Sequence, residues 1–182
     1  MEKTGECSRH RRVDGQCSKT ISHHWGLMVA PKNASGRGFG TKYHAKNPPS
    51  LPNSDDPTWV FETKQVPLEP FEMILVRVTV AKVADRKKLD RILKAVPVVL
   101  DSDDWNCVGW VEDALAELRK ETSRGALTSG AVLGWEKVKL EAKVFVQKKK
   151  DEHRFDGKAE QGKFDSMKVP TWSALEGREL VQ

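Results

Sequence analysis

Cys107 is the residue whose type and position point most directly to chemistry. It stands where an apolar helical pattern begins that runs on to Leu118. At the start of a helix, the dipole and the free backbone N–H groups favour a thiolate over a thiol, and the same groups can bind an oxyanion. Against this, Asp101, Asp103 and Asp104 lie just upstream and would raise the thiol pKa, and cysteine is often simply buried. Position alone leaves Cys107 either a nucleophile or a core residue.

Two histidines could supply the other groups that a thiol nucleophile needs. Such a nucleophile requires a base within hydrogen-bonding reach and a further polar group that orients the base. His24 opens one predicted strand and His44 lies on the facing strand. His23 points to the opposite face from His24, so we expect it to be a bystander, as an isolated strand histidine commonly is.

Metal and cofactor chemistry is not indicated by the cysteines. Cys7 and Cys17 could join His10 and one of His23 or His24, but this spacing matches no standard zinc pattern, so we predict no metal and no cofactor. Three cysteines are also a poor disulfide framework. This cysteine usage favours a reducing, cytoplasmic location.

Composition and charge indicate one ordinary domain with a basic N-terminal segment. The chain has 182 residues, of which 38% are hydrophobic and 31% charged. Net charge is +5, with +6 in residues 1–50 and −1 in the rest. The basic segment lacks any helix-turn-helix, zinc-finger or RNA-recognition signature, so we interpret it as a solvated arm without a specific nucleic-acid partner. No apolar run is long enough to predict a membrane span or a signal peptide.

The chain divides into a flexible basic arm at residues 1–20, a single domain at 21–157 and a C-terminal tail at 158–182. A hairpin is predicted from residues 24–29 and 41–46, and further strands from 59–63 and 73–83. Antiparallel strands and packed helices in segregated runs predict an α+β fold.

Three helices are predicted. One runs from the N-cap Asp85 to the residue before Pro97, and a second starts at Cys107 with N-caps offered by the acidic residues 101–104. A third covers residues 131–150 through apolar positions that include Leu140 and Val144. Its end at residues 148–150 is interpreted as solvated.

These residues together carry a resemblance. The run His24-Trp25-Gly26, then Tyr43-His44 after a glycine-containing turn, then Asn106-Cys107 at a helix start, resembles the circularly permuted papain-like fold of NlpC/P60-type enzymes, especially the lecithin retinol acyltransferase-like branch. The resemblance implies that His24 is the general base, His44 orients it and Cys107 is the nucleophile. We expect Trp25, Asn106 and Trp110 to contact substrate.

Two further comparisons qualify the expected substrate. The chain as a whole is similar over residues 22–157 to a family of small fungal proteins, a likeness that implies no activity. Where the acyltransferase branch usually has an acidic residue and a histidine after Asn-Cys, this chain has Val108-Gly109, and the hydrophobic C-terminal anchor of that branch is absent. We therefore do not expect a lipid substrate.

The sequence thus predicts a cysteine-dependent hydrolase or acyltransferase. It would act on an amide, ester or thioester of a small molecule or peptide through an acyl-enzyme. The alternative is a non-catalytic protein of the same fold that binds a small ligand or serves an accessory role, for example in a biosynthetic pathway. The acyl group, the acceptor and the oligomeric state are left open by the sequence.

Overall fold

A computed structural model describes residues 23–31, 38–47, 59–69, 74–100, 102, 104–120 and 123–182. The fold is α+β, as predicted, with two small sheets and three helices in this part of the chain. The predicted arm at residues 1–20 lies outside the described residues.

The first sheet is antiparallel and contains the predicted hairpin. Its strands are β1 (Leu27–Val29), β2 (Phe39–Lys46) and β3 (Val60–Pro67), in the order β1-β2-β3. The strand β1 is shorter than predicted because residues 24–26 precede the ladder. In the register of β2 and β3, His44 lies opposite Glu62.

The second sheet corrects two predictions. It has the order β4-β5-β6, formed by β4 (Arg77–Thr79), β5 (Thr171–Ser173) and β6 (Arg178–Val181). The strand predicted at residues 73–83 is therefore only three residues long, with an isolated bridge between Val83 and Leu127. The predicted tail at 158–182 was wrong for residues 171–181, because β5 pairs parallel with β4 and antiparallel with β6.

Two of the helices start and end close to the predicted positions. Helix α1 (Arg86–Ala95) has the predicted N-cap Asp85, whose side chain accepts a hydrogen bond from the Lys88 N–H. Helix α2 (Cys107–Arg119) starts at Cys107, but its N-cap is Asn106 rather than one of the acidic residues 101–104, since the Asn106 side chain accepts from the Val108 N–H at 2.9 Å.

Helix α3 (Trp135–Asp151) starts later than predicted, and it buries the predicted positions Trp135, Val138 and Ala142 but not all of the predicted apolar residues. Leu140 and Val144 are 63% and 59% exposed, whereas Phe145 and Lys149 are buried. Among the described residues, no helix is long and apolar enough to cross a membrane.

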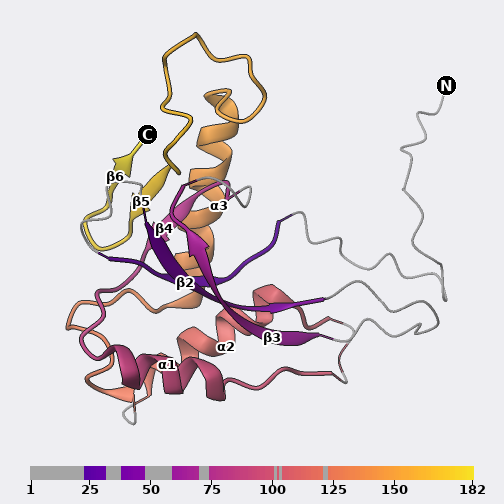
Figure 1. Ribbon diagram of the computed structural model, residues 1–182, viewed down its shortest axis with the longest axis vertical. Helices are drawn as coiled ribbons and strands as arrows, with labels where there is room; N and C mark the ends of the chain where they lie inside the picture. Colours follow the sequence, from indigo (N-terminus) through magenta and orange to yellow (C-terminus); the bar gives the residue numbers. More distant parts are fainter. Residues whose placement is uncertain are drawn as a thin grey trace, which may run out of the picture.

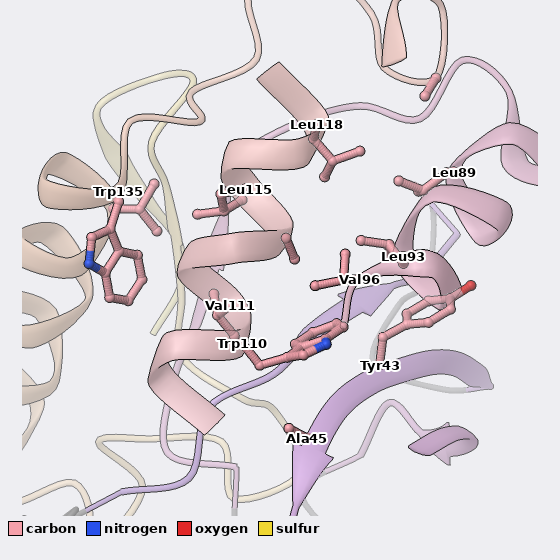
Figure 2. Packing of buried hydrophobic residues seen from close by; sticks show 13 residues of the cluster. Tyr43, Ala45, Leu89, Leu93, Val96, Trp110, Val111, Leu115, Leu118 and Trp135 are labelled. Carbon is pink, nitrogen blue, oxygen red and sulfur yellow. The ribbon is translucent and has the colours of Figure 1, made fainter. Parts of the chain in front are cut away.

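The core lies between the first sheet and the helices (Figure 1). Helices α1 and α2 lie side by side below β2 and β3, while α3 runs next to the second sheet (Figure 1). In Figure 2, the Trp110 side chain extends from α2 towards Val96 and Tyr43, above Ala45, and Tyr43 extends from β2 towards α1. The Tyr43 hydroxyl donates to Asp90 of α1 at 2.9 Å and accepts from Arg86 at 2.7 Å. These contacts fix β2 against both helices.

Lys149 joins α3 to the second sheet and corrects the prediction of a solvated helix end. Its side chain is 1% exposed, and its ammonium lies 2.7 Å from Glu152 and 2.5 Å from Glu179 of β6. The rings of Phe145 and Phe164 also lie near this ammonium, at 5.5 and 5.7 Å. The Glu179 carboxylate therefore compensates the charge of the buried Lys149 ammonium.

We expect Lys149→Met to lower the free energy of unfolding by about 1–3 kcal/mol. Methionine keeps most of the apolar stem but leaves the partly buried carboxylates without this cation, while Lys148 still lies 3.0 Å from Glu179. Urea unfolding measures the change, with the exposed neighbour Lys150→Met as the control. A loss equal to that of the control would show that the buried ion pair does not stabilise the fold.

Candidate active site

The segment before β1 approaches β2 very closely. An added Cβ on Gly26 would lie 3.1 Å from the His44 Cβ and 3.1 Å from the Tyr43 carbonyl oxygen. Such contacts are tighter than side chains normally accept, so glycine permits the approach at this position. This approach brings the segment that contains His24 next to Tyr43 and His44 of β2.

The side chains of His24 and His44 are in contact. The His24 Nε2 lies 2.6 Å from the His44 Nδ1. Tyr43 and Ala45 belong to the core, and strand alternation turns His44, which is 4% exposed, to the other face of the sheet. There the two rings meet edge to face, with centroids 4.9 Å apart.

Two further charged residues extend this pair along the first sheet. The His44 Nε2 lies 3.0 Å from the Glu62 Oε2, and the Lys46 ammonium donates to the Glu62 Oε1. Sequence reasoning missed Glu62 and Lys46. The signal that finds Glu62 is strand register, because His44 and Glu62 are directly opposite in the β2–β3 ladder.

Cys107 lies near Trp25, the residue that follows His24. Backbone groups of Trp25, and of Val108 and Cys107 in the first turn of α2, lie close enough to the thiol to act on its pKa. Cys107 is a free cysteine and only 1% exposed. The structure therefore brings His24 to His44, and the Cys107 thiol near the backbone of Trp25, the residue after His24.

The Cys107 thiol is not ionised as readily as its position at a helix start predicts. Burial raises the pKa of the Cys107 thiol, and the backbone hydrogen bonds offset this only in part. Burial likewise lowers the pKa of His44, although its hydrogen bond to Glu62 opposes the shift. These shifts favour a neutral thiol and a neutral His44 at neutral pH, and a thiol in this state needs a base before it can act as a nucleophile.

Comparison with known proteins gives a family but no activity. Residues 10–181 match a family of unknown function, DUF6914. The chain belongs to this family. No curated protein and no solved structure matches it.

The three expected substrate-binding residues have different surroundings in this DUF6914 chain. Trp110 is fully buried in the core, so the structure corrects its assignment as a substrate contact. Asn106 caps α2 with its side chain. Trp25 is partly buried and packs edge to face on Trp135, with ring centroids 5.7 Å apart. Only Trp25 and Asn106 remain candidates for substrate contact.

Other features of the family domain lie away from this site. A shallow depression at the far end of β1 is lined by Val29, Thr41, Val83 and Arg86 together with nearby residues, none of them a predicted site residue. Within the described part of the chain, no group of three or more His, Cys, Asp or Glu residues could hold a metal ion. Cys7, His10 and Cys17 lie outside that part.

The raised pKa of Cys107 predicts a stability change in mild alkali. Above the ordinary thiol pKa of about 8.5, the unfolded chain loses this proton while the native state keeps it, so the free energy of unfolding falls as pH rises. Urea unfolding between pH 7 and 9.5 measures the slope. This range stays below the titration of Tyr43, whose pKa burial raises to about 12.

The comparison for this experiment is Cys107→Ala over the same pH range. We expect the variant to lose stability less steeply than the wild type above pH 8.5, because the titrating thiol is gone. Equal slopes would contradict the raised pKa.

Proposed function

We propose that the protein is a cysteine-dependent hydrolase or acyltransferase that acts on an amide, ester or thioester. The observation that carries the proposal is the His24–His44 contact beside Trp25, whose backbone lies near the Cys107 thiol. A thiol, a histidine and a second group hydrogen-bonded to that histidine form the arrangement on which thiol nucleophiles depend. The order His, His, Cys along the chain further supports a permuted papain-like arrangement of NlpC/P60 type.

The proposed reaction begins with the neutral thiol. His24 removes the Cys107 proton as Sγ attacks the carbonyl carbon, and an S–C bond forms while the carbonyl oxygen becomes an oxyanion. The backbone N–H of Cys107, in the first turn of α2, stabilises this oxyanion, whereas the Val108 N–H donates to the Asn106 side chain. His24 then returns the proton to the departing amine, alcohol or thiol, which leaves a thioester on Cys107. Water or an acceptor amine attacks the thioester and releases the thiol.

Labelling of each cysteine by iodoacetamide, read by peptide mass spectrometry between pH 6 and 10, tests the proposal. We expect Cys107 to react near neutral pH at a rate that falls at least about 10-fold in His24→Ala. Without the base, labelling should rise only in alkali, since the pKa of the Cys107 thiol is raised. His23→Ala is the matched control and should label like the wild type.

The burial of Cys107 favours a second function, a non-catalytic protein that binds a small ligand. In that case Cys107 packs the start of α2 and reacts only when the chain unfolds. Labelling of Cys107 only in denaturant, with Cys7 and Cys17 labelled normally, would overturn the enzyme proposal and support this alternative.

A further inference from the structure

We propose that Glu62 is a positioning residue that fixes the protons of both histidines, so that His24 carries its lone pair on Nδ1. The catalytic consequence rests on the proposed function, whereas the proton positions do not.

The first step is the charge of Glu62. Hydrogen bonds from Lys46 and His44 lower the pKa of this carboxyl, so it is ionised at neutral pH. An ionised carboxylate only accepts hydrogen bonds. At 3.0 Å from the Glu62 Oε2, the His44 Nε2 must therefore carry the proton.

The second step is the neutrality of His44. The charged groups that face it are Lys42 and Lys46 on β2 and Glu62 on β3, and the net effect of burial and these groups is a lowered pKa. A neutral imidazole with its proton on Nε2 has a lone pair on Nδ1 and accepts there. The only polarity that suits the 2.6 Å contact is then donation from the His24 Nε2 to the His44 Nδ1.

The third step concerns His24 itself. When a neutral His24 carries its proton on Nε2, its lone pair is on Nδ1. The opposite tautomer would place two lone pairs face to face between the histidines. In the proposed reaction, Nδ1 takes the thiol proton, and the imidazolium that results is stabilised by Glu62 through His44. Lys46 holds the other oxygen of Glu62 and so keeps the carboxylate in place.

Long-range ¹H–¹⁵N correlation spectra of the full chain with ¹⁵N-labelled histidine test the assignment at pH 7.5. We expect both His24 and His44 of the wild type to carry the proton on Nε2. In Glu62→Gln, the amide can donate as well as accept, so the fixed tautomers should be lost, while Glu62→Asp should retain them. The matched control is Asp156→Asn, which removes a carboxylate 2.9 Å from the His153 Nδ1, distant in sequence from this site.

Cysteine labelling of the same variants connects the tautomers to reactivity. Glu62→Gln should slow Cys107 alkylation at least about 10-fold at unchanged melting temperature, because the base is no longer held in one tautomer. A wild-type His44 protonated on Nδ1, or unchanged tautomers in Glu62→Gln, would overturn the inference. The expected tautomers with an unreactive Cys107 would instead support the role of Glu62 and overturn the proposed function.

Discussion

Cys107→Ala is expected to abolish acyl transfer while the fold stays intact. If Cys107 forms the covalent intermediate, no other group replaces it, and the rate should fall at least about 10³-fold. The measurement is turnover of a panel of short thioesters, esters and amides, with circular dichroism to show that α2 still forms. Loss of the sulfur from a buried position leaves a small cavity, so a modest drop in melting temperature is compatible with this result.

The control for this variant is Cys17→Ala, which changes a cysteine outside the described residues. It should hydrolyse the same substrates at the wild-type rate. Turnover in Cys107→Ala that equals the wild type would remove the proposed mechanism, because the nucleophile would lie elsewhere.

Trp110→Ala is expected to lower the free energy of unfolding by about 3–5 kcal/mol. The indole is fully buried between α2 and the first sheet, and the Phe61 ring lies 5.5 Å from it. Its removal opens a cavity next to Ala45, one residue from His44 (Figure 2). Guanidinium unfolding measures the loss. We also expect Cys107 to be labelled at a rate that no longer depends on His24, because the packing around the site is disrupted.

Trp110→Phe keeps an aromatic ring in the core and removes the indole N–H together with part of the ring volume. The indole N–H finds no hydrogen-bond partner among the described residues, so its loss costs little. We expect this variant to lose less than half as much stability as Trp110→Ala. If the two variants lost the same free energy of unfolding, the core would depend on the shape of the whole indole and not on its apolar volume alone.

The helices and the hairpin were predictable because their signals are local. Asp85 before an apolar pattern, and Cys107 at the start of another, mark α1 and α2 without any knowledge of the rest of the chain. The approximate positions of His24 and His44 on a hairpin follow in the same way. Local signals therefore gave the elements that hold the candidate site.

Features that depend on distant partners were not predictable. The strand β4 is short because only residues 77–79 meet β5, almost a hundred residues later. Lys149 is buried because Glu179 of β6 lies beside it. Glu62 was not predicted for a related reason, since its contact with His44 depends on the register of two strands separated by residues 47–59.

The parallel pairing of β4 with β5 has a consequence for the order of folding. Every residue of the candidate site lies before residue 120, whereas β4 finds its neighbour only at residues 171–173. Closing so long a loop is entropically costly and slow, while the hairpin and α2 can form early. During synthesis on the ribosome, the first sheet and α2 can thus assemble around Cys107 well before the second sheet is complete.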